Sequence, residues 1–390
     1  MRRLGGARLG VLAHAASVDR RLRHLGALLN GAGIRPALLF APEHGFSAAA
    51  QDMAAVGREH DALSGAPIVS LYGADAEDLA PRPEHLAQID VLLIDLMDVG
   101  SRYYTFVWTA LLTVRAARAA GVHCIVLDRP NPLGGLASAV EGRSQQPGFL
   151  SFVGLEPVPI RHSLTLAELV ALHAAADGME LGPDGALSVV PVRGWKRAEQ
   201  ADDWDRPFVP PSPNMPSPDT ALAYPGGCLI EGTNLSEGRG HTRPFEVAGA
   251  PWLDGARLAR ELDATGLPGF VPRPISFVPT FHKHAGERCG GVQIHPLDPA
   301  SFRPVATYLA LVTLAHAQRP DAFRFRTERY EFVDDIPAFD LLTGSAEARQ
   351  AILAGENARA VAKRFAEAEL GWPERMAEAS AAVERAAWQE

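Results

Sequence analysis

The stretch "DVLLIDLMDVGSRYYTFVWTALLTVRAARAAGVHCIVLDRP" (residues 90–130) decides the fold of this chain. It opens on an apolar run (90–98), continues through a helical stretch that ends at Gly121, and closes on a second apolar run (123–130). Apolar runs of four to seven residues without alternation are typical of parallel strands that are buried on both faces. The stretch therefore predicts a strand–helix–strand unit of a parallel α/β sheet.

The same rhythm extends on both sides of this unit. Further apolar runs are "RLGVLAHAA" (8–16), "PALLFAP" (36–42), "PIVSLYG" (67–73) and "LSVVPVRGW" (187–195). Helices are predicted over 19–33, with a glycine stop, and over 163–178, where Thr165 and Glu168 form a capping box. Together they predict a doubly wound parallel sheet of about six strands.

The second half of the chain has a different character. The segment 207–227 is so rich in proline that we expect no regular structure there. Beyond it the pattern predicts short strands over 275–281 and 291–296, and long helices over 301–318 and 346–370. The chain has 390 residues, which is more than usually fold around a single hydrophobic core. We therefore predict two domains, 1–200 and a smaller α+β domain at 201–390.

Composition and charge exclude several functional classes. An apolar content of 47% with 21% charged residues is that of a soluble globular protein. The net charge of −9 argues against a nucleic-acid partner, although local arginines can still form a positive pocket. The three cysteines are scattered, which predicts neither a disulfide framework nor a cysteine-rich zinc site. Without a long apolar run or a signal-like start, we expect no membrane association and a cytoplasmic protein.

Polar residues gather just past the apolar runs, where parallel sheets bind their ligands. The residues that follow the second, fourth and fifth strands are Glu43 and His44, then Asp98, Arg102 and Tyr103, then Asp128 and Asn131. Loops at the opposite ends of the strands lack such a concentration of polar and aromatic residues, so this asymmetry predicts a binding site at one edge of the sheet. Neither GxGxxG nor GxxxxGK[ST] occurs, which argues against a dinucleotide or ATP site.

Each of these residues also has a structural interpretation, and position alone leaves both open. Glu43 is as well suited to ending its strand as to catalysis, and "DRPNP" around Asp128 and Asn131 also suits a fixed turn. His162 precedes the capped helix and fits a loop role. His282 and His284 share one side of a strand, but no third ligand has a suitable spacing, so no metal site is expected.

The segment "EGTNLSEGRGHTRPFE" (231–246) is too polar and glycine-rich for a core element. Two arginines, Arg239 and Arg243, flank a His-Thr pair that includes Thr242, and Glu231 and Glu237 lie upstream. Alternating charges with glycine hinges suit a loop that turns guanidinium groups toward a carboxylate or phosphate. We therefore expect this loop to bind an anionic ligand.

Five motifs together resemble the exo-β-N-acetylmuramidases of the NamZ type, formerly a family of unknown function. They are "PEHGF" (42–46), "DVGSRYYTF" (98–106), "LDRPNPLGG" (127–135), "PPSPNMPS" with "TALAYPG" (210–226) and the segment 231–246. The resemblance runs from about residue 5 to the C-terminal helices. It implies a Rossmann-like N-terminal domain, a smaller C-terminal domain, and an active site in the cleft between them.

The resemblance also implies an activity and roles for residues. It implies release of N-acetylmuramic acid from the non-reducing end of peptidoglycan-derived fragments, with a muramic acid-containing glycan fragment as substrate and no cofactor. The glutamate of the PEHG motif falls on Glu43 as the catalytic residue, and Glu231 or Glu237 is the candidate second carboxylate. The expected substrate-binding residues are His44, Asp98, Arg102, Tyr103, Asp128, Asn131, Arg161, His162, Asn234, Arg239, Thr242 and Arg243. Arg239, Arg243 or Arg102 is expected to pair with the lactyl carboxylate of the sugar.

Two alternatives stay open at this point. Where the family often has "TNPT" after its first strand, this chain has "AHAAS", and the residues after PEHGF also differ. These departures leave room for a hydrolase or transferase that acts on another anionic sugar. A non-catalytic glycan-binding protein on the same scaffold is the other alternative, and the sequence does not indicate an oligomeric state.

Overall fold

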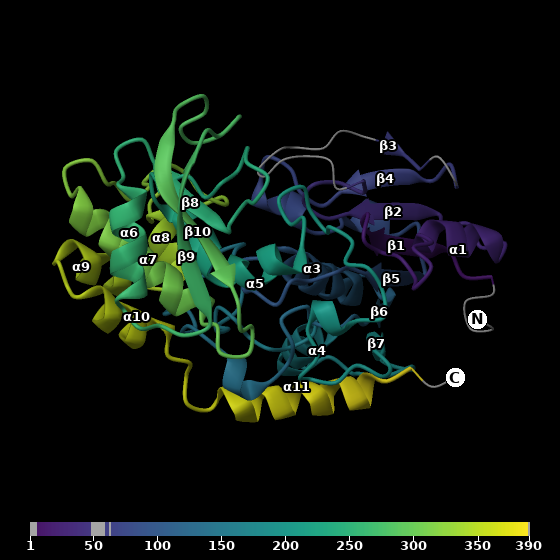
Figure 1. The fold of residues 1–390 in the computed structure, drawn as a ribbon. Coiled ribbons are helices and arrows are strands. Elements are labelled where there is room, and N and C mark those ends of the chain that lie inside the picture. The colour runs from purple at the N-terminus through teal and green to yellow at the C-terminus, as the bar shows by residue number, and fades with distance from the viewer. Residues whose placement is uncertain (1–5, 48–58, 62–63, 389–390) are drawn as a thin grey trace.

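A doubly wound parallel sheet forms the first part of the molecule (Figure 1). The structure, a computed structural model, describes residues 6–47, 59–61 and 64–388. The strands are β1 (Leu9–Ala13), β2 (Leu38–Ala41), β3 (Glu59–His60), β4 (Pro67–Ser70), β5 (Val91–Asp95), β6 (His123–Leu127) and β7 (Leu187–Val190). Their order is β3-β4-β2-β1-β5-β6-β7, and all neighbours are parallel except the short edge strand β3. The prediction of six parallel strands is confirmed.

Alternate residues of the strands face two different hydrophobic clusters, because side chains alternate across a sheet. Leu12, Phe40 and Ile94 join a large cluster with residues of helices α3 and α4. Val11 and Leu93 face the opposite cluster, which includes residues of helix α1. The helices of this part are α1 (Leu25–Gly31), α2 (Pro83–Leu86), α3 (Phe106–Ala119) and α4 (Leu166–Ala176).

The predicted helices differ in how well their limits agree with the structure. Helix α3 matches the predicted 105–121, and α4 begins at the capping box that Thr165 and Glu168 were expected to form. Helix α1 is shorter than predicted and starts only at Leu25. Leu22 adopts a left-handed backbone, with φ of 58°, and His24 caps the helix from its side chain, so the preceding residues form a turn.

The C-terminal part, from Pro218 onward, contains a small antiparallel sheet that packs against helices (Figure 1). Its strands, in spatial order, are β8 (Val247–Ala250), β10 (Cys289–Pro296) and β9 (Phe270–Phe277). Its helices are α5 (Pro218–Gly227), α6 (Gly255–Asp263), α7 (Pro304–Gln318), α8 (Ala338–Thr343), α9 (Glu347–Leu353), α10 (Ala358–Ala366) and α11 (Trp372–Ala386). The prediction of a smaller α+β unit is confirmed, although the single helix expected over 346–370 is divided where Asn357 caps α10.

The prediction of no regular structure over 207–227 is wrong for its second half. Residues 207–217 are irregular as expected, but α5 begins at Pro218. Proline is well placed at the first helical position, where its missing N–H removes no hydrogen bond. Ser217 caps the helix by accepting a hydrogen bond from the Thr220 N–H.

The two parts share a single large core. Trp108 from the parallel-sheet part and Tyr308 from the C-terminal part belong to the same hydrophobic cluster. Helix α11 returns to the parallel-sheet part and packs against α4 and β7 (Figure 1). The division of the chain at residue 200 stays a prediction. Among the described residues, no helix is both long enough and apolar enough to cross a membrane.

A glycine in the segment 231–246 is required by close packing between the segment and α8. A Cβ added to Gly232 meets the backbone N and Cα of Phe339 at 2.6 Å, whereas a Cβ at Gly31 meets nothing within 4 Å. We expect Gly232→Ala to destabilise the protein by about 1–3 kcal/mol, because backbone atoms must shift. We expect the matched Gly31→Ala to be neutral or to stabilise by up to about 1 kcal/mol. Urea unfolding of both variants checks this, and equal midpoints would contradict the packing argument.

Candidate active site

A cavity lies between the carboxyl-end loops of β2 and β5 and the C-terminal part. Its walls come from distant stretches of the chain, and four of the five motifs described above contribute to them. The lining residues are Glu43, His44, Tyr103, Tyr104, Thr105, Val153, Ser212, Asn214, Met215, Tyr224, Glu231, Arg239, Phe245, Tyr330 and Glu331. We refer to this cavity as the cleft.

Glu43 enters the cleft from the loop that follows β2. Its side chain is buried, with 6% of its surface exposed. The hydroxyl of Thr105, at the start of α3, donates a hydrogen bond of 2.8 Å to Glu43 Oε2. A carboxylate held at the beginning of a helix lies in the favourable part of the helix dipole. The fold therefore holds Glu43 in a defined position.

The backbone beside Glu43 is strained. His44, which is not a glycine, has φ of 71°, and Gly45 follows with φ of 81°. Left-handed conformations of this kind cost about 1–3 kcal/mol and persist only where the surrounding structure imposes them. Two other lining residues, Phe245 and Glu331, also have positive φ. Three of the eight described non-glycine residues with positive φ thus line the cleft.

Glu231 faces the cleft from the C-terminal part with both oxygens engaged. Arg239 Nη2 donates to Oε1 at 2.6 Å, and the hydroxyl of Tyr330 donates to Oε2 at 2.7 Å. The Arg239 guanidinium also lies over the Phe245 ring, 5.1 Å from its centre. Charge-assisted hydrogen bonds of this kind fix both partners strongly. Glu231 and Arg239 therefore form one rigid unit.

Glu237 lies behind Arg239 and does not line the cleft. Its side chain is fully buried and lies 3.0 Å from Lys283 Nζ, 3.0 Å from His282 Nδ1 and 3.3 Å from Arg239 Nε. Burial alone raises the pKa of Glu237, but the neighbouring cations, Lys283 first, outweigh it and hold the pKa below its usual value. Glu237 is therefore an ionised anchor for Arg239.

The sequence analysis missed Glu331, a further carboxylate in the cleft. It is 6% exposed, its backbone has φ of 45°, and the Tyr72 hydroxyl donates to its Oε2 at 3.1 Å. Glu331 lies outside every motif, and only tertiary structure brings it to Glu231 by way of Tyr330. No pattern in the sequence distinguishes it from a surface glutamate.

Further aromatic and polar residues of the motifs also line the cleft. Tyr104 and Tyr224 lie edge to face with ring centres 5.9 Å apart, and burial raises the pKa of both phenols well above its usual value. Protonated phenols remain available as hydrogen-bond donors. Ser212, Asn214 and Met215 complete this wall from the proline-rich segment. These residues lie within the motifs, but the alternation of polar and apolar residues in a motif does not show which positions line a cavity.

Arg102, a candidate for the lactyl carboxylate, lies outside the cleft. It is fully buried, and its guanidinium donates to the carbonyls of Arg143, Val158 and Leu342 at 2.6, 2.7 and 2.5 Å. Burial lowers its pKa to about 10. Both terminal nitrogens donate to main-chain carbonyls, so we assign Arg102 a structural role. Tyr103, next in sequence, lines the cleft and donates to the Pro225 carbonyl.

Four further candidates support the loops rather than line the cleft. Asp98 accepts from the Gly100 N–H at 2.7 Å, and burial raises its pKa to about 7. His162 is buried 3.7 Å from Asp98, and burial lowers its pKa to about 3. Asn131 bonds within its own turn and to the Leu164 carbonyl, and Arg161 donates to the Leu133 carbonyl. These contacts hold the strand-end loops together.

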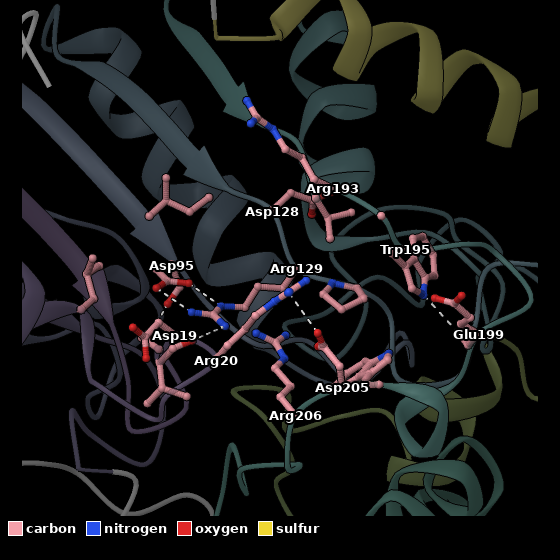
Figure 2. A pocket seen from close by; sticks show the side chains of 18 of the residues that line it. Asp19, Arg20, Asp95, Asp128, Arg129, Arg193, Trp195, Glu199, Asp205 and Arg206 are labelled. Atoms are coloured by element: carbon pink, nitrogen blue, oxygen red, sulfur yellow. Dashed lines mark hydrogen bonds and ion pairs between the residues drawn. The ribbon is translucent and has the colours of Figure 1, made fainter. Parts of the chain in front are cut away.

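Asp128 belongs to a different hollow, at the carboxyl ends of β1, β5, β6 and β7 (Figure 2). It accepts hydrogen bonds from the Thr165 hydroxyl and the Ala167 N–H at the start of α4, and burial raises its pKa to about 7. In Figure 2 the ion pairs Arg129–Asp95 and Arg20–Asp205 cross the same hollow. The predicted rim of the sheet is therefore divided between two cavities, and only one contains Glu43.

The remaining candidates, Asn234, Thr242 and Arg243, lie away from the cleft. Asn234 lines a third hollow and accepts a hydrogen bond from the Arg324 N–H. Thr242 and Arg243 are exposed, and Arg243 lies 3.6 Å from Glu246. Within residues 6–47, 59–61 and 64–388, no group of three or more His, Cys, Asp or Glu side chains is arranged to hold a metal ion.

Comparison with known proteins gives a consistent family assignment. The family model "Exo-beta-N-acetylmuramidase NamZ, N-terminal" matches residues 9–219, and its C-terminal counterpart matches residues 222–380. A relative from Bacillus subtilis (strain 168), "Peptidoglycan beta-N-acetylmuramidase NamZ", is 41% identical over 325 residues, which cover 83% of this chain and 76% of that protein.

Two solved structures from Bacteroides fragilis share the fold. Both are described as DUF1343 family proteins. The first is 29% identical with a TM-score of 0.84, over 97% of this chain and 94% of the other. The second is 24% identical with a TM-score of 0.71, over 98% and 95%, and supports the fold alone.

A buried histidine, His14, joins the loops that carry the site and makes their stability depend on pH. Its Nε2 accepts from the Met97 N–H at 2.9 Å, and its Nδ1 lies 3.3 Å from the Pro211 carbonyl. Burial lowers its pKa to about 3, whereas an unfolded histidine titrates near 6.5. The stability that neutral His14 contributes is present above pH 6.5 and is lost as the pH falls toward 3.

Between pH 7 and pH 5 we expect His14 alone to reduce the free energy of unfolding by about 2 kcal/mol. Urea unfolding at both pH values, on the wild type and on His14→Gln, measures this. The variant is expected to lose about 2 kcal/mol less than the wild type over this interval. Parallel losses in the two proteins would show that His14 is not held neutral.

Proposed function

The chain belongs to the NamZ family of exo-β-N-acetylmuramidases and is a glycosidase, and on this basis we propose that it releases N-acetylmuramic acid from the non-reducing end of peptidoglycan-derived fragments in the cleft. We place the reaction in the cleft because Glu43, Glu231 and Arg239, which come from distant parts of the chain, line the same cavity. The alternative of a non-catalytic glycan-binding protein has no such support.

We assign Glu43 as the proton donor to the glycosidic oxygen. Glycoside cleavage requires an acid on the leaving group and stabilisation of an oxocarbenium-like centre. Glu43 is buried, is held by Thr105 on one oxygen, and stands beside a strained turn. A carboxyl group in such a position approaches the scissile bond with little freedom to misalign.

We assign Glu231 to stabilising the positive charge that develops on the sugar. Arg239 and Tyr330 hold both of its oxygens, which suits a fixed anion better than a group that must form and break a covalent bond. Preorganised charges of this kind act strongly where water is excluded. Glu331, on the same wall, is a candidate to orient the attacking water. Glu237 serves only as the anchor of Arg239.

We assign Arg239 to the lactyl carboxylate that distinguishes muramic acid from glucosamine. Among the residues that the structure describes, Arg239 is the one guanidinium that lines the cleft. Guanidinium groups recognise carboxylates through paired hydrogen bonds. Glu231 and Glu237 fix the orientation of Arg239, so its guanidinium has one geometry at the cleft.

Removing the proton donor should affect substrates according to their leaving groups. We expect Glu43→Gln to lower kcat about 10²–10⁴-fold on a muramic acid-containing disaccharide. A 4-nitrophenyl muramide should lose much less, because nitrophenolate departs without a proton. Steady-state kinetics on both substrates, with the melting temperature as the test of folding, measures this.

Glu199→Gln, a change at the rim of the other hollow, serves as the control and should retain wild-type kinetics. Equal losses of the Glu43→Gln variant on both substrates would assign Glu43 a role other than acid. Undiminished turnover of the disaccharide would remove Glu43 from the mechanism.

Recognition of the lactyl group is tested by pairing a substrate with its uncharged analogue. We expect Arg239→Gln to lower kcat/KM for an aryl muramide at least about tenfold more than for the same glycoside with its lactyl carboxylate converted to an amide. The same comparison on Arg243→Gln, at the exposed end of the segment, is expected to show no difference. Equal losses of the Arg239 variant on both glycosides would reject the assignment.

A further inference from the structure

A cationic hollow lies on the C-terminal part, outside the cleft. It is formed by the turn between β9 and β10, by the loop after α7 and by the start of the segment 231–246. Its lining residues are Thr233, Asn234, His282, Lys283, His284, Arg324, Phe325, Arg326 and Glu328. Three permanent cations and two histidines thus face one carboxylate. In a chain with a net charge of −9, such a concentration of positive charge is a local feature.

The two arginines of the hollow donate hydrogen bonds to main-chain carbonyls rather than to carboxylates. Arg324 donates to the Phe323 carbonyl at 2.6 Å, and Arg326 donates to the Arg329 carbonyl at 3.1 Å. Neither forms an ion pair with a carboxylate of the part of the chain that the structure describes. The hollow therefore contains two guanidinium groups that no salt bridge among the described residues holds, and Asp321, which pairs with Arg319, acts electrostatically on Arg324.

Asn234 holds the walls of the hollow in place through hydrogen bonds to groups of two other loops. Its side chain accepts from the Arg324 N–H at 2.9 Å and donates to the Ala322 carbonyl at 2.9 Å. The main-chain carbonyl oxygen of Asn234 lies 2.7 Å from His284 Nε2. His282 and His284 both have positive φ, so the turn is held in a strained conformation. This arrangement presents the cations of two loops toward a common space.

The hollow and the cleft adjoin, because residues that line one are in contact with residues that line the other. Arg326 lies over the ring of Tyr330, 5.1 Å from its centre, and Tyr330 donates to Glu231 on the cleft side. Lys283 bonds to Glu237 and to the Ile230 carbonyl, and Glu237 in turn contacts Arg239. The start of the segment 231–246 thus contributes Glu231 to the cleft and Thr233 and Asn234 to the hollow.

We propose that this hollow is a second binding site, specific for an oxyanion group, a carboxylate or a phosphate, held between Arg324 and Arg326. Guanidinium groups bind both kinds of oxyanion through paired, charge-assisted hydrogen bonds. Two sources share this chemistry. One is an anionic group on the substrate beyond the scissile bond, and the other is a separate small anion. The site itself does not depend on the reaction in the cleft.

Direct binding tests the site without reference to catalysis. Inorganic pyrophosphate is titrated calorimetrically, at low ionic strength, into the full-length wild type and into Arg324→Gln, Arg326→Gln and the double variant. We expect each single variant to bind about tenfold or more weakly, and the double variant to show no measurable binding. Arg257→Gln is the matched control, because Arg257 pairs with Glu261 outside the hollow, and it should bind like the wild type.

Kinetics then separate the two sources. If the anion belongs to the substrate, the double variant raises KM for a muramide with a carboxylate on its aglycone at least about tenfold relative to one with an uncharged aglycone. If it is a separate anion, the two KM values change alike while pyrophosphate binding is lost. Either result supports the site. Pyrophosphate binding that is absent in the wild type, or equal in the wild type and the double variant, would overturn the proposal.

Discussion

The arrangement of the C-terminal part depends on one buried ionic contact, that of Arg239 with Glu231 and Glu237. A buried guanidinium is stable only where carboxylates and hydrogen bonds replace the water it has lost. Glu231 meets that need from the cleft side, and Glu237, held by Lys283 and His282, meets it from behind. The polar, glycine-rich segment 231–246 is built to bring these charges together, and Gly232 is small because α8 packs directly on it. The charges of the cleft are therefore fixed before any ligand arrives.

The parallel-sheet part contributes through the positions of its strand-end loops. Glu43 follows β2, and Tyr104 and Thr105 follow β5, so the cleft lies across the end of β1, which β2 and β5 flank. His14, which follows β1, accepts a hydrogen bond from the Met97 N–H and approaches the Pro211 carbonyl, and so connects the loop after β5 to the proline-rich segment. A doubly wound sheet offers one edge for binding. In this protein that edge is divided between the cleft and the hollow of Figure 2, and the proline-rich segment contributes Ser212, Asn214 and Met215 to the cleft.

Much of the fold was predictable because buried parallel strands leave clear apolar runs, and all six were found from sequence. Helix α5 was missed because a proline count does not show that Pro218 occupies the first helical turn. Among the candidate residues, Glu43, Glu231 and Arg239 line the cleft, whereas Arg102 and Asn131 bond to main-chain groups. The sequence places all of them in similar motifs and does not show which guanidinium faces a cavity and which faces carbonyl oxygens. Glu331 has no local signal, since only the packing of the C-terminal part brings it to the cleft.

The central claim is that the sugar lies in the cleft with its lactyl carboxylate on Arg239 and its glycosidic oxygen beside Glu43. A crystal structure of the Glu43→Gln variant soaked with a muramic acid-containing disaccharide tests it most directly. We predict that the lactyl oxygens lie within hydrogen-bond distance of the Arg239 guanidinium and that the scissile oxygen is next to residue 43. A disaccharide bound instead in the hollow of Figure 2, or in the cleft with its carboxylate turned away from Arg239, would contradict this account.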